Sequence, residues 1–174
     1  APAPAPRSDA IEDALARVNA ASSRADADPR ALEDALTALG DAFLDANQNA
    51  KAGASYNEAL QLAERHAGLE SERVLAPLLG LGNTLAASGR HQQAVPRLQR
   101  ALAIQRSQYG LFDLRQQATL KSLAASLTKL DRTAEAEKAI AGILSDDPLY
   151  TLDEASPRVM ELYNNVKRQS TPQL

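Results

Sequence analysis

Residues of like character recur every 42 positions in three successive copies, and this spacing constrains the fold more than any other feature of the chain. The recurring small residues are Gly40, Gly82 and Ala124, and Ala52, Ala94 and Ala136. The recurring large residues are Leu36, Leu78 and Leu120; Leu39, Leu81 and Leu123; Phe43, Leu85 and Leu127; Tyr56, Leu98 and Ile140; and Leu60, Leu102 and Leu144. A period of this length indicates stacked supersecondary units that share one continuous core.

Each copy is expected to be a pair of helices, which makes the fold class all-α. Alanine dominates an apolar fraction of 44%, and the strand-favouring β-branched residues are scarce. The first helices are expected at 29–46, 72–88 and 114–130, and the second helices at 49–67, 91–108 and 133–145. Asp28 and Pro29 form a capping residue followed by a proline suited to the first helical position. Asn47 and Gly89 suit the left-handed conformation that ends a helix, and Asp131 can cap the next one.

The ends of the chain depart from the repeat. Residues 1–7 are predicted to be a disordered Ala/Pro leader, and residues 8–27 a helix that covers the first repeat. Residues 28–147 are predicted to form the three repeats, at about 28–69, 70–111 and 112–147. Asp146–Ala155 is expected to be a loop, and residues 148–174 are expected to hold a capping helix and a tail. Val159, Leu162, Tyr163 and Val166 give that helix its apolar face.

The Leu-Gly pairs, with the small and apolar positions that follow them, resemble the tetratricopeptide repeat. The usual period of that family is about 34 residues, so the 42-residue spacing is similar to its long-helix branch, as in kinesin light chains. The run from Gly89 to Leu98, continued by Arg100 to Ile104, matches that branch well. The resemblance covers about residues 29–147. It implies a right-handed α-α superhelix, a solenoid of three helix pairs with flanking helices, and a concave groove that binds a protein or a peptide.

A second resemblance concerns the compartment. Gly110-Leu111-Phe112, the run Asp147 to Tyr150 and the run Ser156 to Val159 resemble repeat proteins of bacterial cell envelopes. Some of those proteins precede TonB-like modules, although no TonB-like strand region occurs in this sequence. An Ala/Pro leader often follows a removed secretory signal, but a linker would look the same. The chain has no cysteine, which fits an oxidising compartment. A periplasmic or secreted location is therefore expected, with the cytoplasm as the alternative.

The sequence holds no pattern typical of an enzyme, and neither a cofactor nor a metal is expected. His66 and His91 lie in different repeats and lack a second ligand at metal-binding spacing. Gly-rich phosphate loops are absent. No cluster of basic residues with interleaved aromatics indicates nucleic acid, and no apolar run is long enough to cross a membrane.

The surface predicted to bind a partner is formed by five positions of each first helix, which the resemblance places on the groove. The predicted contact residues are Asp34, Thr37, Asp41, Leu44 and Asp45 in the first repeat; Leu79 and Asn83 in the second; and Lys121, Thr128 and Lys129 in the third. This surface runs from acidic through apolar to basic. A ligand is predicted to lie across Asp41, Asn83 and Lys121. Reversal of either charge is expected to slow association without changing stability.

Some members of the family clamp the C-terminal carboxylate of a ligand. Asn83 and Lys121 match the residues of that clamp, whereas Thr37, Asp41 and Ala125 do not. Since Asp41 would repel a carboxylate, a clamp of this kind is not expected. The leading hypothesis is thus a scaffold for a protein or a peptide. The alternative is a self-associating module, in which residues 1–87, with a net charge of −6, meet residues 88–174 of another copy, with +3.

Overall fold

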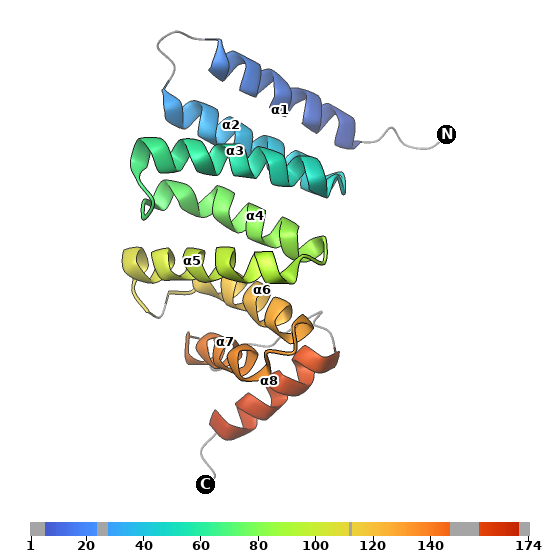
Figure 1. The fold of residues 1–174 in the computed structure, drawn as a ribbon, viewed down its shortest axis with the longest axis vertical. Coiled ribbons are helices and arrows are strands. Elements are labelled where there is room, and N and C mark those ends of the chain that lie inside the picture. Colours follow the sequence, from blue (N-terminus) through green and yellow to red (C-terminus); the bar gives the residue numbers. More distant parts are fainter. Residues whose placement is uncertain (1–5, 24–27, 112, 147–156, 171–174) are drawn as a thin grey trace, which may run out of the picture. The chain divides into compact units, whose positions relative to one another are not determined.

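The computed structural model describes residues 6–23, 28–111, 113–146 and 157–170. The chain falls into two compact units, Ala1–Ser88 and Gly89–Leu174. Figure 1 shows the helices of both units. Two predictions lie mostly outside the described residues. They are the disordered leader predicted for residues 1–7, of which residues 1–5 are not described, and the loop predicted for Asp146–Ala155, of which only Asp146 is described.

The first unit is a stack of four α-helices, α1 (Pro6–Ser22), α2 (Pro29–Asp45), α3 (Asn49–Ala67) and α4 (Leu75–Ala87). A short 3₁₀ turn, η1 (Glu72–Val74), leads directly into α4. Asp28 caps α2 as predicted, because its side chain accepts a hydrogen bond from the amide of Arg30 at 2.9 Å. α1 lies against α2, as expected of a covering helix, and it buries Ala14. Leu15, the next residue of the same helix, is 41% exposed.

Tyr56 on α3 fills the space that glycines leave on two first helices. A Cβ atom on Gly40 of α2 would come within 2.6 Å of the Tyr56 ring, and one on Gly80 of α4 would clash with the same ring. Tyr56 is 1% exposed, so its ring is part of the core between α2, α3 and α4. The repeat pattern predicts a close approach at Gly40. It gives no sign of Gly80, because that position holds Ala38 and Ser122 in the other repeats.

The second unit contains α5 (His91–Tyr109), α6 (Gln116–Lys129), α7 (Thr133–Asp146) and α8 (Pro157–Ser170). α6 contacts both α5 and α7, and α8 contacts α6 and α7 (Figure 1). The Thr119 hydroxyl on α6 donates to Oε1 of Gln105 on α5 at 2.9 Å, and both side chains are buried. Val159, Leu162, Tyr163 and Val166 of α8 are all buried, which confirms the apolar face predicted for that helix.

The turn within each helix pair places one residue in the left-handed conformation. The φ angles of Asn47, Gly89 and Asp131, which lie 42 residues apart, are 57°, 73° and 58°. The prediction is confirmed for Asn47 and Gly89. Asp131 adopts the same conformation as the other two, and its carboxylate pairs with Arg158 of α8 at 2.9 Å. This ion pair ties the start of α8 to the turn between α6 and α7.

The all-α fold of helix pairs is confirmed, and the described residues contain no strand. Most helix boundaries lie within two residues of the predicted ones. The larger differences are at the N-terminus of α4, where η1 takes the first turn, and at the C-terminus of α1, which ends at Ser22, whereas the prediction ran to residue 27. The predicted leader is wrong at residues 6 and 7, because α1 begins at Pro6. None of the helices in the described ranges has the length and apolarity to span a bilayer.

Candidate partner-binding surface

The five predicted contact positions keep their degree of exposure from one repeat to the next. Three columns are exposed in every repeat: Asp34, Ala76 and Ala118; Asp41, Asn83 and Ala125; and Asp45, Ala87 and Lys129. The column of Thr37, Leu79 and Lys121 is half-buried throughout. The last column, Leu44, Ala86 and Thr128, is half-buried in its first two members and buried in the third. We call the three exposed columns the first-helix surface.

The columns that hold the same kind of residue in every repeat are buried rather than exposed. Both the Leu36 column and the Leu39 column are at most 7% exposed in all three repeats, and the Ala52 column is fully or almost fully buried. The three columns of the first-helix surface, which change between repeats, are therefore also the ones that face solvent. Burial explains why the repeated positions must stay apolar or small, whereas the first-helix surface is free of that constraint.

In the first unit, Asp41 is held in place by the core. The Tyr56 hydroxyl donates to Oδ1 of Asp41 at 2.6 Å, and Asp41 itself is exposed. Burial of the ring raises the pKa of the Tyr56 hydroxyl above its ordinary value, and the bond to Asp41 raises that pKa further. Asp41 therefore has a structural role that the sequence pattern does not reveal. A charge reversal there would also break a core hydrogen bond, so stability is no longer expected to stay unchanged.

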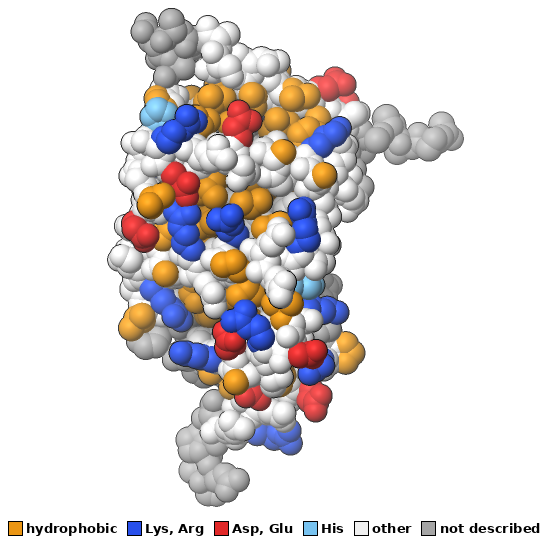
Figure 2. Space-filling model, viewed as in Figure 1, with side chains coloured by type: hydrophobic (Ala, Val, Ile, Leu, Met, Phe, Trp, Pro, Cys, Tyr) orange, Lys and Arg blue, Asp and Glu red, His pale blue; other side chains and the backbone are white. Residues whose placement is uncertain are grey.

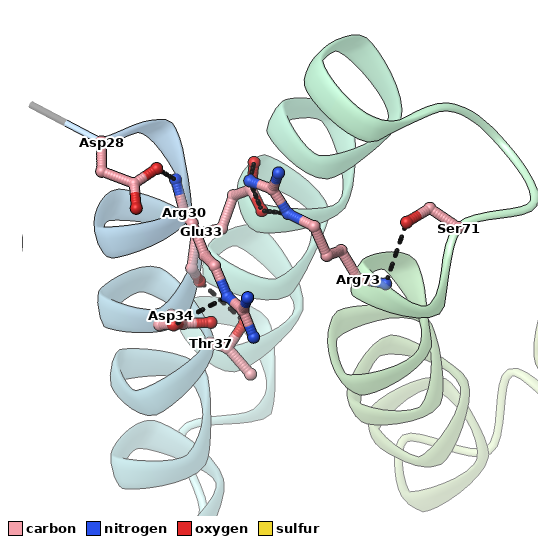
Figure 3. Close-up of polar contacts among 7 residues, drawn as sticks. All are labelled: Asp28, Arg30, Glu33, Asp34, Thr37, Ser71 and Arg73. Carbon is pink, nitrogen blue, oxygen red and sulfur yellow. Dashed lines mark hydrogen bonds and ion pairs between the residues drawn. The ribbon is translucent and has the colours of Figure 1, made fainter.

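The other predicted contact residues of the first unit differ in their side-chain contacts and in their exposure. The Asp34 carboxylate lies 3.9 Å from Nε of Arg30, and both side chains are largely exposed (Figure 3). The Thr37 hydroxyl donates to the carbonyl of Glu33 at 2.8 Å within its own helix. Asp45 and Asn83 are exposed, whereas Leu44 and Leu79 are half-buried. Asp34, Asp45 and Asn83 thus present polar groups to solvent.

A buried ion pair lies beside this surface and has no signal in the sequence. Arg73 of η1 donates from Nη2 to Oε1 and Oε2 of Glu33 at 2.8 and 2.7 Å, and from Nε to Oε2 at 3.0 Å (Figure 3). Glu33 is 3% exposed. The pair joins the N-terminal part of α2 to the turn that leads into α4. Its members are 40 residues apart, and the Glu33 column continues as Leu75 and Gln117, so the repeat offers no clue to it.

In the second unit, the predicted contact residues are two lysines and a threonine whose hydroxyl is already hydrogen-bonded. Lys129 is exposed, and Lys121 is half-buried. Thr128 is 6% exposed, and its hydroxyl donates to the carbonyl of Ala124 at 2.8 Å. Because Thr128 is satisfied within α6, we leave it out of the proposed contact residues.

Arg115, which lies 42 residues after Arg73, makes a different set of contacts. It pairs with Asp113 at 2.7 Å, and its guanidinium lies 3.5 Å from the centre of the Tyr109 ring. Hydrogen bonds from Arg115 lower the pKa of the exposed Asp113 carboxyl from 3.8 to about 2. One repeat later, Leu75 stands at the position of Glu33. Arg115 therefore has no carboxylate at that position, and a pair like Glu33–Arg73 cannot form again.

The predicted line across Asp41, Asn83 and Lys121 crosses from one unit to the other. Asp41 and Asn83 belong to the first unit and Lys121 to the second, and each unit is described only by itself. The line therefore stays a prediction.

Neither histidine lies in a group that could hold a metal, because the described residues contain no set of three or more His, Cys, Asp or Glu arranged for one.

The sequence pattern of the tetratricopeptide repeat matches residues 31–107 and, in a second overlapping match, residues 73–141. The two matches together cover more than half of the chain. The chain belongs to the tetratricopeptide repeat family.

Solved structures with similar folds agree with this membership. BtubC (BKLC) from P. vanneervenii superposes with a TM-score of 0.79 at 15% identity, over 93% of this chain and 65% of BtubC. Nearly identical TPR-like repeats of a Podosopora anserina kinesin light chain homologue superpose with a TM-score of 0.74 at 18% identity. That match covers 93% of this chain and 78% of the other. At these identities the likeness concerns the fold alone.

This chain therefore spans a little under two thirds of the length of BtubC. No curated protein sequence matches it well enough to count as a relative. Tetratricopeptide repeat proteins bind protein partners and are generally non-enzymatic scaffolds. Membership in this family supports a general role in protein interaction.

Proposed function

We propose that this tetratricopeptide repeat protein binds another protein or a peptide through its first-helix surface. The observation that carries the proposal is the exposure of the three columns that change between repeats. Where packing does not dictate the residue, the first repeat presents Asp34, Asp41 and Asp45, and the third presents Lys129. Exposed charges of opposite sign in the first and third repeats would select a partner that carries charges of both signs.

The proposed contacts have different roles. The Asn83 side chain is exposed, and its amide can both donate to and accept from a ligand backbone. Asp41 uses Oδ1 for Tyr56, and its exposed carboxylate would attract a basic group of the ligand. Lys121 and Lys129 would attract an acidic group. Leu44 and Leu79, both half-buried, would add apolar contact area.

Partner capture from cells of the source organism tests this proposal. The wild-type chain and the variants Asn83→Ala, Asp41→Asn and Lys129→Glu would be used as baits. Asp41→Asn keeps an acceptor for Tyr56, so it removes the charge without removing the core hydrogen bond. The matched control is Asn57→Ala on α3, which changes an exposed Asn outside the first-helix surface. We expect the surface variants to lose the partner and the control to retain it. Retention by all three surface variants would refute the proposal.

The second candidate is self-association, which the uneven charge favours. Residues 1–87 carry a net charge of −6 and residues 88–174 carry +3, so a head-to-tail contact between copies would pair opposite charges. Light scattering over a range of protein concentration and salt separates the candidates. A mass that rises with concentration and falls with salt would favour self-association, whereas a constant monomer mass would exclude it.

We also propose a bacterial cell envelope as the location, in the periplasm or outside the cell. The absence of cysteine fits this proposal. Fractionation of the source organism, followed by immunoblotting, is the test. Recovery in the periplasmic or secreted fraction is expected, and recovery only in the cytoplasm would contradict it.

A further inference from the structure

A hollow of about 380 Å³ opens in the second unit between α5 and α7. Its floor is formed by Leu120, Leu123 and Leu127 of α6, which lies beneath both helices. Ala103 of α5 and Ala139 of α7 line its walls. Both walls come from second helices of the repeats, so this hollow does not belong to the first-helix surface.

The leucines of the floor are only 1–5% exposed, and small residues on α7 leave the open space above them. Ala139 and Gly142 of α7 stand where α5, 42 residues earlier, carries Arg97 and Arg100. Gly142 lies close enough to the floor that an added Cβ would meet Leu120 at 3.3 Å. A helix with two arginines at these positions would lay their long aliphatic stems over its neighbour. The helix α7 lacks those stems and leaves a recess with an apolar floor and a partly polar lining.

The charges around the recess are predominantly positive. Arg106 and Lys138 line it and are exposed, and Nε of Arg106 donates to Oε1 of Gln116 at 3.3 Å. Glu135 also lines it, but its carboxylate is paired with Arg132 at 2.6 Å.

The surrounding sequence has the same sign. Residues 89–146, which include all three helices of the recess, contain nine Lys and Arg side chains and five acidic ones. Figure 2 shows Lys and Arg side chains with hydrophobic ones between them where Figure 1 draws α5, α6 and α7. A recess with an apolar floor and such a rim fits an apolar side chain that is flanked by carboxylates.

We propose that the recess between α5 and α7 is a second docking site, and that it binds an acidic segment of a partner protein. An aliphatic or aromatic side chain of that segment enters the recess and contacts the leucines of α6. Carboxylates on either side of it face Arg106 and Lys138. The proposal deepens the proposed scaffold function, but it involves a different face of the helices and other residues.

A titration of the isotope-labelled full chain with synthetic peptides tests the proposal. The probe is a short peptide in which Glu and Leu alternate. Peptides that alternate Lys with Leu and Glu with Ser separate the charge requirement from the apolar one. We expect saturable shifts of backbone amide signals around the recess with the Glu/Leu peptide, and much weaker binding of the other two. Since rim charges are screened by salt, the affinity should fall as ionic strength rises.

Two variants and two matched controls locate the binding. Ala103→Trp fills the recess from an exposed position, and Lys138→Glu reverses one rim charge. Each is expected to weaken Glu/Leu peptide binding, Ala103→Trp by about tenfold or more. Ala118→Trp changes an exposed alanine of the first-helix surface, and Arg97→Glu reverses an exposed charge of α5 outside the recess. Both controls are expected to retain most of the affinity.

Several results would overturn the proposal. These are the absence of saturable binding by the Glu/Leu peptide, binding that survives Ala103→Trp and Lys138→Glu, or an equal loss with Arg97→Glu. A protein mass that rises with concentration and is restored to a monomer by Ala103→Trp would show a second copy in the recess, which also contradicts it. The variants Asn83→Ala and Lys129→Glu of the first-helix surface do not touch the recess. Failure of the docking site in the recess and failure of the first-helix surface can therefore be told apart.

Discussion

The Glu33–Arg73 pair shows how a single polar contact can set the junction between two helices. The Glu33 side chain is 4% exposed and that of Arg73 is 29% exposed, so the carboxylate depends on the guanidinium for its hydrogen bonds. Removal of one partner from such a pair leaves a buried charge without compensation. Replacement of both partners by apolar groups avoids that cost.

Arg73→Met is therefore expected to lower the free energy of unfolding by about 2–4 kcal/mol. The double variant Glu33→Met with Arg73→Met should recover most of this loss. Arg30→Met is the matched control, because Arg30 lies 3.9 Å from Asp34 with both side chains largely exposed. That control should change stability by less than about 1 kcal/mol. Chemical denaturation measures all three, and equal effects of Arg73→Met and Arg30→Met would contradict the structural role of the buried pair.

The contact of Asp113 with Arg115 leads to a prediction about the titration of the Asp113 carboxyl. Its pKa is lowered to about 2 by Arg115, so the folded state prefers the ionised carboxyl. Any stabilisation from this contact is fully present well above pH 3.8 and is lost as the pH falls through about 2. An NMR titration of the side-chain carboxyl should give a midpoint near pH 2 in the native protein. In Arg115→Gln the midpoint should move toward the ordinary value, and an unchanged midpoint would mean that Arg115 is not the cause.

Among the elements, the approach of α2 to α3 depends on the absence of a side chain at Gly40. In Gly40→Ala the new Cβ would lie 2.6 Å from the Tyr56 ring, and overpacking of this kind costs about 1–3 kcal/mol. At Gly53 the nearest atom to a new Cβ is 3.8 Å away, so Gly53→Ala should gain up to about 1 kcal/mol in helix propensity. Thermal unfolding of the two variants should thus shift in opposite directions. Equal shifts would mean that Tyr56 adjusts freely.

The third repeat suggests a compensating change for the first. It has Ala124 and Ile140 where the first repeat has Gly40 and Tyr56. Combining Gly40→Ala with Tyr56→Ile reproduces that smaller pair and should be more stable than the sum of the two single losses implies, as in a double-mutant cycle with coupling. Strict additivity of the two changes would contradict direct packing between these residues.

The helices could be predicted from the sequence because each repeated column has one packing role. The recurrence of Leu36, Leu39 and Ala52 marks the buried faces, and the turn residues Asn47 and Gly89 mark the ends. Contacts that occur in only one repeat leave no such trace. Gly80 against Tyr56, Glu33 with Arg73 and the recess beside Ala139 all depend on a residue that the other repeats lack.

For the whole molecule, the predicted surface was partly accessible to sequence reasoning. The three exposed columns could be predicted from their place in the repeat. The structural role of Asp41 and the burial of Thr128 could not, because both depend on side chains from the surrounding helices. The identity of a partner depends on how the exposed columns combine, and their chemistry follows no repeat.

Site-directed photo-crosslinking in cells of the source organism tests most directly whether the first-helix surface binds a partner. A photoreactive amino acid would replace Asn83 on α4 or Lys129 on α6 and, as controls, Asn57 or Gln61 on α3, all of which are exposed. The account predicts one common partner protein crosslinked from positions 83 and 129 and none from positions 57 and 61. Crosslinks from the α3 positions alone, or from none of the four, would contradict it.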